Sequence, residues 1–323
     1  VYYKNNTYDN FSNMIDYYME LSELWIPVTI AAAALQCVRT ALQRNLSGTM
    51  SAIGATYVRY LFGAPWAMAI LVVLLLGTER AMPSLPASFF WWCLLGGSCQ
   101  IVGTWLLLIA FRLRNFAVGT VFAKTETMQV ALLGTIVLGE TLGLMSWLGI
   151  VISLGGVFLL SLMPQAGSGW VGRLRDLSAP ATRIGLASGF LFALCAVTIR
   201  AGALSLGDQD PLLRALIVLA VMSAIQTVLM TLYVVARERR QFALMLANAP
   251  KALLIGLTSI AGSMGWYLAM TLETPAKVQA VGQIELVFTV LVSRLAFGER
   301  PRLSELAGIA LIVVGILALL AGR

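Results

Sequence analysis

The chain has 323 residues, of which 59% are hydrophobic and only 11% are charged. A soluble protein carries about 25% charged residues, so this composition indicates an integral membrane protein. The net charge is +7 and histidine is absent, which excludes histidine-based proton relays, the zinc-protease HExxH motif and Ser-His-Asp triads.

The first residues differ from the rest of the chain. They are rich in Tyr, Asn and acidic residues and contain no long apolar run. A signal peptide needs a basic start and an apolar core, and this stretch does not resemble one. We interpret residues 1–24 as a lead-in of unknown role.

Ten apolar segments follow, each about 20 residues long and therefore able to cross about 30 Å of hydrocarbon as a helix. They lie near residues 25–43, 52–77, 88–111, 116–138, 143–163, 181–203, 211–236, 252–271, 275–297 and 303–321. The predicted fold is an all-α integral membrane protein with ten transmembrane helices.

Local signals fit helices in these positions. Pro65 lies inside the second segment and predicts a kink there. Asp210-Pro211 and Thr274-Pro275 are typical of an N-cap followed by Pro at the first helical position. Several glycines predict close approach between helices, namely Gly96, Gly97, Gly103, Gly149, Gly155, Gly156, Gly308 and Gly315.

The chain repeats itself with an offset of 159 residues. This shift places Glu126 on Glu285 and Glu140 on Glu299, and it also aligns Gly149 with Gly308 and Gly156 with Gly315. We predict two five-helix repeats, residues 25–163 and 181–323, joined by a loop at 164–180. Because each half has an odd number of helices, the second half is inverted relative to the first.

Basic residues predict the orientation of the chain in the membrane. Twelve Lys and Arg residues fall in loops on the side opposite the N-terminus and four fall on the N-terminal side. The positive-inside rule therefore predicts that both termini lie outside the cytoplasm and that the 237–251 loop is cytoplasmic.

Two acids are expected near the middle of the membrane. Glu126 lies about ten residues into its segment, roughly 15 Å deep, and Glu285 lies at the matching depth of the other half. A charge at this depth costs at least ~2.5 kcal/mol, so each acid is expected to face a cavity or a partner. One interpretation is a substrate or proton site. The other is an inert structural pair, in which Lys124, Arg59 or Arg200 neutralises each acid.

Other polar and aromatic side chains are candidates for the same site. Lys124 aligns with Gln283 in the other half, so the predicted site is asymmetric. The roles of Arg59, Arg39 and Arg200 stay open, and Glu140 and Glu299 are expected to make capping or loop contacts. If a central cavity exists, we expect Trp105, Trp266 and Tyr267 to line it, although packing is the more common role for such aromatics.

The cysteines do not form a CxxC pair. All four lie in apolar segments, where Cys is usually a small buried hydrophobic residue, so we expect neither a metal site nor a disulfide. We also expect no cofactor and, because there is no basic-aromatic array, no nucleic-acid partner. The expected partners are a small-molecule substrate and the lipid bilayer.

Gly-Glu turns after the fourth and ninth segments, each with another Glu fourteen residues earlier, occur here in two five-helix halves. This pattern resembles the EamA type of the drug/metabolite transporter superfamily, and Arg59-Tyr60 is similar to an Arg-aromatic pair of that family. The sequence departs from the family at Thr127 and Leu286, where Pro often follows the acid. The resemblance implies a central cavity between inverted halves and export or exchange of small polar metabolites, amino acids or drugs. It also implies cytoplasmic termini, against the basic-residue count.

The sequence favours a secondary transporter that is proton-coupled or an exchanger, in the inner (plasma) membrane of a bacterium. No GxxxxGK[ST] motif is present, so the energy is expected to come from an ion gradient or from exchange. Neither DDxxD nor GxGD is present to support an intramembrane enzyme. The alternative is a non-catalytic lipid-handling or structural membrane subunit. A cavity that carries Glu126, Glu285 and Lys124 would favour transport, whereas a dry core would favour the structural role.

Overall fold

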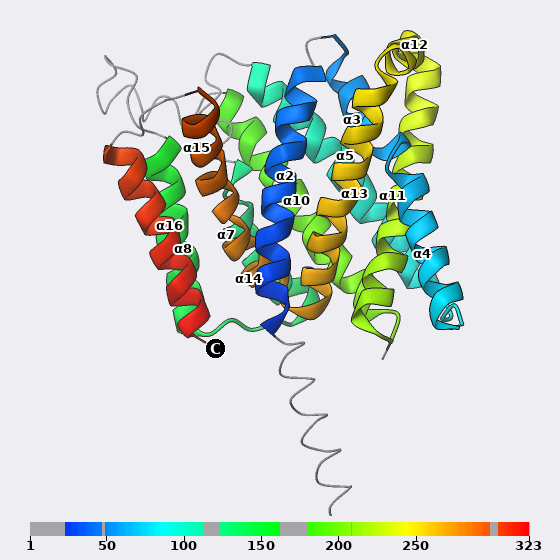
Figure 1. Cartoon of the computed structure of the whole chain (residues 1–323). Coiled ribbons are helices and arrows are strands. Elements are labelled where there is room, and N and C mark those ends of the chain that lie inside the picture. Colours follow the sequence, from blue (N-terminus) through cyan, green and yellow to red (C-terminus); the bar gives the residue numbers. More distant parts are fainter. Residues whose placement is uncertain are drawn as a thin grey trace, which may run out of the picture.

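The computed structural model describes residues 23–46, 49–79, 81–112, 123–161, 180–207, 209–297 and 303–322, and its regular structure within them is helical (Figure 1). In chain order the helices are α2 (Trp25–Leu46), α3 (Ala52–Leu61), α4 (Ala64–Thr78), α5 (Ala87–Arg112), α7 (Glu126–Leu138), α8 (Leu144–Ser161), α10 (Pro180–Leu204), α11 (Pro211–Arg237), α12 (Arg240–Ala247), α13 (Ala249–Leu272), α14 (Pro275–Gly282), α15 (Ile284–Phe297) and α16 (Leu303–Ala321).

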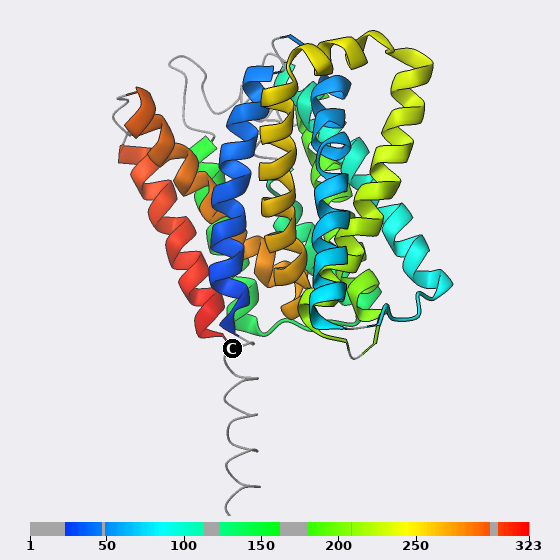
Figure 2. The same ribbon diagram turned by 45° about the vertical axis from the view of Figure 1, so that its right-hand side comes forward.

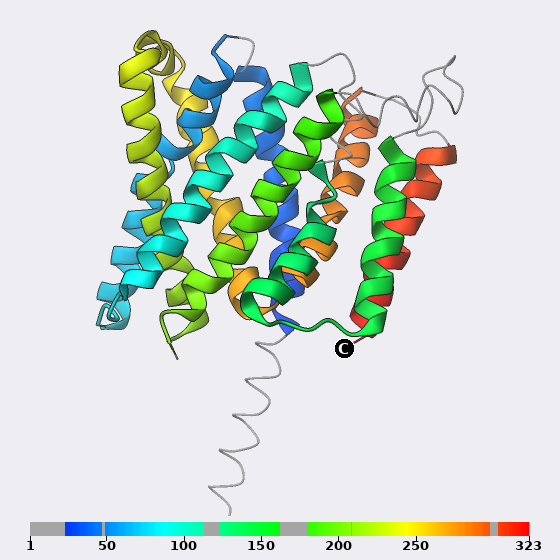
Figure 3. The same cartoon turned by 180° about the vertical axis from the view of Figure 1, so that it is seen from behind.

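Apart from the short α12, the helices of the described part of the chain fall into ten segments that run up and down between the same two edges (Figures 1 and 3). The second segment consists of α3 and α4, and the ninth of α14 and α15. Within the described residues, five helices are long and apolar enough to cross a membrane, as judged from length and composition: Ala52–Thr78, Ala87–Ala110, Thr182–Leu204, Pro211–Arg237 and Ala249–Leu272. Shorter apolar helices include most of α7, α8 and α16. The predicted all-α membrane fold is confirmed.

The second segment is interrupted next to Pro65, as predicted. Helix α3 ends at Leu61 and α4 begins at Ala64, with Phe62 and Gly63 between them. Proline has no N–H and its ring clashes with the preceding turn, so a break just before it satisfies both constraints. The equivalent α11 in the second half runs for 27 residues without interruption.

The ninth segment differs from the continuous helix expected over 275–297. It breaks at Gln283, where Gln283 N–H donates to Ala280 O at 3.3 Å and Leu286 N–H donates to Gln283 O at 3.0 Å. These bonds span three residues, which tightens the backbone locally without any proline. In the fourth segment, expected at 116–138, α7 starts at Glu126 after a turn at Lys124 and Thr125, and residues 113–122 lie outside the described part.

Glycines reveal the two-fold relation between the halves. A Cβ on Gly149 would lie 2.6 Å from Gly315 O, and a Cβ on Gly156 would lie 2.6 Å from Gly308 O. Because Gly149 aligns with Gly308 and Gly156 with Gly315, the 159-residue shift converts each contact into the other. A two-fold axis between α8 and α16 produces this relation. Figure 3 shows these two helices side by side at one end of the bundle.

A second pair of contacts follows the same relation. Gly103 of α5 faces Leu191 of α10, and the equivalent Gly262 of α13 faces Leu35 and Ala32 of α2. Close packing at small residues is therefore confirmed, with the exception of Gly155, whose added Cβ would meet nothing within 4 Å. The cysteines are free, and all but the partly buried Cys37 are buried; no cluster of potential metal ligands occurs among the described residues.

Capping differs between the two predicted Asx/Thr-Pro sites. The Asp210 carboxylate accepts from Leu212 and Leu213 N–H at 2.9 and 3.2 Å, which confirms the cap of α11. Thr274 occupies the N-cap position of α14 without a side-chain cap bond, and Glu273 Oε1 accepts from Thr274 N–H instead.

The edge of the bundle that holds α12 lies opposite the C-terminus (Figure 2), and which edge is cytoplasmic stays a prediction. The lead-in and the 164–180 loop lie almost wholly outside the described residues.

Candidate functional site

Both acids lie where a helix begins inside the bundle. Glu126 is the first residue of α7, and Glu285 is the second residue of α15, directly after the break at Gln283. The Trp266 ring covers Gly282 at the end of α14, and a side chain at that glycine would collide with it. The sequence therefore positions the two equivalent acids at equivalent interruptions of the fourth and ninth segments.

Glu285 is held by residues of the other half. Lys124 Nζ lies 3.0 Å from Glu285 Oε2, and Gln36 Nε2 of α2 donates to the same oxygen at 3.0 Å. The Lys124 and Glu285 side chains retain 23% and 13% of their exposure. The bond is therefore a charge-assisted contact in a largely desolvated place, and it links the first half to the second.

Glu126 has different surroundings. It is half-buried, and among the described residues it makes neither a hydrogen bond nor an ion pair. The charges of Lys124 and Glu285 nevertheless reach it, the first attractive and the second repulsive. Lys124 precedes Glu126 by two residues in the chain but bonds to Glu285.

Gln283, the counterpart of Lys124, has a packing environment. Its side chain is 2% exposed, its Nε2 donates to Thr127 Oγ1 at 2.8 Å, and its Oε1 accepts from Ser153 Oγ at 2.6 Å. The amide joins the helix break to α7 and α8 and satisfies its own buried polar atoms. The predicted asymmetry between Lys124 and Gln283 is therefore visible in their contacts, while their roles in function stay untested.

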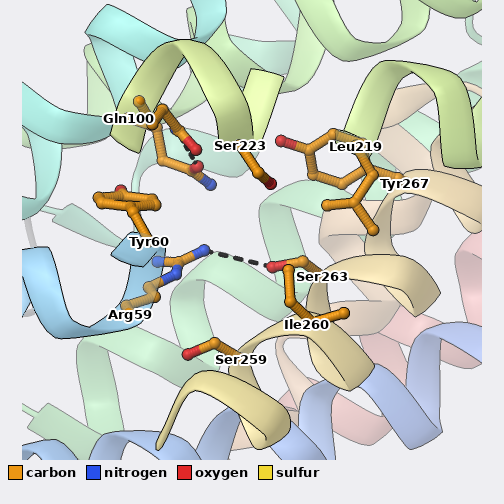
Figure 4. A pocket seen from close by; sticks show the side chains of 10 residues that line it. Arg59, Tyr60, Gln100, Leu219, Ser223, Ser259, Ile260, Ser263 and Tyr267 are labelled. Atoms are coloured by element: carbon orange, nitrogen blue, oxygen red, sulfur yellow. Dashed lines mark hydrogen bonds between the residues drawn. The ribbon is translucent and has the colours of Figure 1, made fainter. Parts of the chain in front are cut away.

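A small polar cavity surrounds Arg59 (Figure 4). It has about 10 Å³ for the centre of a water molecule, which is room for roughly one water. Its walls come from α3, α5, α11 and α13, and the residues are Arg59, Tyr60, Gln100, Leu219, Ser223, Gln226, Ser259, Ile260, Ser263 and Tyr267. Glu126, Lys124 and Glu285 are not among them, so the expected cavity around the acids is not this one.

Arg59 is buried without an acid beside it. Its guanidinium lies 5.3 Å from the centre of the Tyr60 ring, and Nη2 donates to Ser263 Oγ at 3.4 Å, a long bond. Within the described part of the chain, no carboxylate lies within 4 Å of it. A positive charge at membrane depth costs at least ~2.5 kcal/mol, and this one is only partly compensated.

Arg39 is electrostatically coupled to both regions. Arg59 repels its positive charge and Glu285 attracts it. Its Nε is buried and lacks a hydrogen-bond partner among the described residues. Among these arginines, Lys124 and the two acids, the direct contact within the described residues is the Lys124–Glu285 ion pair.

The three candidate aromatics occupy three different places. Tyr267 is buried, lines the Arg59 cavity and directs its hydroxyl to Met222 Sδ at 2.8 Å. Trp266 packs on Gly282 and has a buried Nε1 without a partner in the described part of the chain. Trp105 is 42% exposed and lines a separate apolar groove of about 220 Å³ with Tyr233 and Met230.

Arg200 joins three elements near the end of the bundle where α7 terminates. Gly139 adopts φ 70° and ends α7, a left-handed conformation that glycine enters at little cost. The following Glu140 accepts from Arg200 Nε at 3.0 Å, and Arg200 Nη1 donates to Met270 O at 3.2 Å. Burial raises the pKa of the Glu140 carboxyl above its ordinary value, while Arg200 acts in the opposite direction. The expected loop contact is confirmed for Glu140; Glu299 lies outside the described residues.

Several polar residues of this region were not singled out as site candidates. Gln36 and Ser153 complete the contacts of Glu285 and Gln283, and Ser259 and Ser263 face Arg59. The signal available in the sequence was their polarity inside otherwise apolar segments. It is weak because Ser and Gln also occur in helices that pack without function.

Comparisons with known proteins agree on the architecture. The chain matches the description "EamA-like transporter family" twice, over residues 23–162 and 183–321. No curated protein matches. A solved structure described as "Crystal structure of protein" is 17% identical, with a TM-score of 0.69, and the match covers 94% of this chain and 97% of that one. At this identity the likeness shows the fold alone.

Proposed function

Because this chain belongs to the EamA-like transporter family, a family of small-molecule transporters and not of enzymes, we propose that it is a secondary active transporter. It moves small polar metabolites, amino acids or drugs by alternating access between the two inverted halves. Export is the direction we propose. The membrane we propose is the inner (plasma) membrane of a bacterium, with the 237–251 loop in the cytoplasm.

One observation carries this proposal. The Lys124–Glu285 ion pair, with Gln36 on the same oxygen, crosses from one half to the other beside a break in the ninth segment. Alternating access moves one half against the other, so a pair at this position must lengthen or break during the cycle. A proton or a charged group of the substrate then takes the place of the lost partner.

Glu126 supports coupling to a proton or an exchange. Its carboxyl is half-buried, has no hydrogen-bond partner in the described chain and lies within reach of the Lys124 charge. A cationic substrate would compete with a proton for this acid, which yields exchange directly. A zwitterion would instead place its ammonium at Glu126 and its carboxylate at a basic residue.

The small size of the cavity favours one alternative, a structural or lipid-handling subunit of the same fold. Room for about one water beside Arg59 is what a closed core provides. An occluded transporter has the same appearance, so only an assay of transport separates the two functions.

The test is uptake into liposomes that contain the purified chain, with a panel of labelled amino acids, amines and carboxylates, with and without a pH gradient. We expect at least one compound to accumulate above protein-free liposomes. We also expect Glu126→Gln or Glu285→Gln, which keep the side-chain shape, to alter the response to pH between about 5.5 and 8, because each removes a titratable group. If folded forms of both variants transport as the parent does over this range, the acids are structural; if no compound accumulates, the subunit alternative gains.

A further inference from the structure

The Arg59 cavity has the donors of an anion site. Arg59 carries five N–H donors in a planar fork, and among the described residues one of them makes a long bond to Ser263. Opposite it stand hydroxyls and amides of α5, α11 and α13 (Figure 4). Ser259 is buried in this wall, and its Oγ has no hydrogen-bond partner among the described residues. Buried polar groups are normally satisfied, so the cavity has unused donors.

The charges around Arg59 also favour an anion site. Three cations, Arg39, Arg59 and Lys124, and two carboxylates, Glu126 and Glu285, lie in this part of the described chain, and of these Lys124 and Glu285 form an ion pair. Lys124 already bonds to Glu285, and Arg39 feels the same acid. Among the described residues, neither Arg39 nor Arg59 forms an ion pair with a carboxylate, and Arg59 is the one of these two that lines the cavity.

We propose that Arg59 binds a carboxylate of the transported molecule, with Ser259 and Ser263 as further donors, so that the substrates are small organic carboxylates. A guanidinium fork matches the two oxygens of a carboxylate, and hydroxyls donate to the remaining lone pairs. This inference rests on the proposed transport function. Because the cavity now has room for about one water, a carboxylate enters when the surrounding helices separate, as alternating access requires.

The experiment measures binding and does not depend on transport. The purified full chain in detergent is heated with propionate, lactate, succinate or alanine, and separately with propionamide, lactamide, succinamide or alaninamide, at equal concentration and ionic strength. Unfolding is followed by intrinsic fluorescence. We expect at least one carboxylate to raise the unfolding temperature and its amide to have no effect, because ligand binding to the folded state stabilises it.

Variants assign this binding to the cavity. Arg59→Gln should weaken the apparent affinity for the carboxylate about ten- to hundredfold, the usual effect of losing a hydrogen bond to a charged group. Arg237→Gln, the same change at an exposed arginine, should bind as the parent does. If Arg59→Gln does not fold, Ser259→Ala replaces it. The lost hydroxyl has no hydrogen-bond partner within the described part of the chain, so folding should be unaffected while carboxylate affinity falls severalfold.

Three outcomes of the binding experiment would overturn the inference: none of the carboxylates stabilises the protein, amides stabilise as well as acids, or binding persists unchanged in folded Arg59→Gln or Ser259→Ala. Selective carboxylate binding without any uptake in liposomes would refute the transport proposal alone. Uptake of compounds without a carboxylate, insensitive to Arg59→Gln, would refute this inference and leave transport standing.

Discussion

The two halves share a backbone plan and differ in the side chains that face the centre. Each half presents one acid at the start of a helix, Glu126 on α7 and Glu285 on α15. Glu285 has two partners from the other half, whereas Glu126 has none by hydrogen bond in the described residues. An inverted repeat therefore does not imply two equal sites.

The difference extends to the charges and the hydroxyls. The three central cations, Arg39, Arg59 and Lys124, all belong to the first half, and the 159-residue shift places them on Thr198, Val218 and Gln283. Ser223, Ser259, Ser263 and Tyr267 of the cavity belong to the second half. The glycine contacts between α8 and α16 have stayed symmetric. Packing thus preserves the two-fold relation while the polar site has lost it.

The largest effect should come from replacing Lys124, because this residue forms an ion pair with Glu285 and not with Glu126. We expect Lys124→Gln to lower transport at least tenfold. Removing one member of a fully buried pair destabilises a protein by about 3–5 kcal/mol, and the partial exposure here should reduce this to about 1–2 kcal/mol. Liposome uptake and thermal unfolding measure the two effects separately.

The double variant Lys124→Gln/Glu285→Gln is the control for this prediction. It leaves neither member of the Lys124–Glu285 pair without its partner, so stability should return toward that of the parent while transport stays low. Full recovery of transport in the double variant would show that the pair has a structural role, and parental transport by Lys124→Gln alone would contradict the asymmetry.

A smaller effect should appear at the symmetric seam, by which we mean the contact of Gly149 and Gly156 on α8 with Gly308 and Gly315 on α16. Gly156→Ala places a methyl group 2.6 Å from Gly308 O, and Gly315→Ala places one 2.5 Å from Ser153 N. Both should destabilise the protein by about 1–3 kcal/mol, the usual range for overpacking. Gly155→Ala, in the same helix but with open space at its Cβ, should lower the unfolding temperature little or not at all. Unequal losses at Gly156 and Gly315 would show that the seam is less symmetric than its geometry.

Much of the fold could be predicted from the sequence because its signals are local or repeated. Apolar length gives the spans, and the offset of 159 residues gives the pairing of the halves, since one shift maps α7 onto α15 and α8 onto α16. Pro65 gives the break in the second segment. The break at Gln283 has no such marker, because it depends on a buried amide that bonds to Thr127 and Ser153 from distant parts of the chain.

The site could be predicted only in part, for a related reason. Depth and repeat selected Glu126 and Glu285, but which basic residue pairs with which acid depends on helix rotation. In membrane helices both faces are apolar, so periodicity cannot distinguish a face toward lipid from a face toward the centre. The sequence alone does not distinguish Trp105, which lies in an outer groove, from Tyr267, which lies in the cavity, because both are aromatic residues within apolar segments.

The smallest effect concerns the helix N-caps. Asp210 and Thr274 both occupy N-cap positions, but only the Asp210 side chain makes a cap hydrogen bond. Ser51 and Asp210 are equivalent under the repeat, and both accept N–H bonds at the start of their helices. Asp210→Ala should destabilise by about 1 kcal/mol, since it removes bonds to Leu212 and Leu213 N–H. Thr274→Ala should change stability by less than this, because the Thr274 Oγ1 is buried and makes no cap bond. Thermal unfolding of the two variants in one detergent decides the matter: an equal loss for Thr274→Ala would mean that its hydroxyl has a partner in the folded protein, and no loss for Asp210→Ala would mean that packing alone fixes the start of α11.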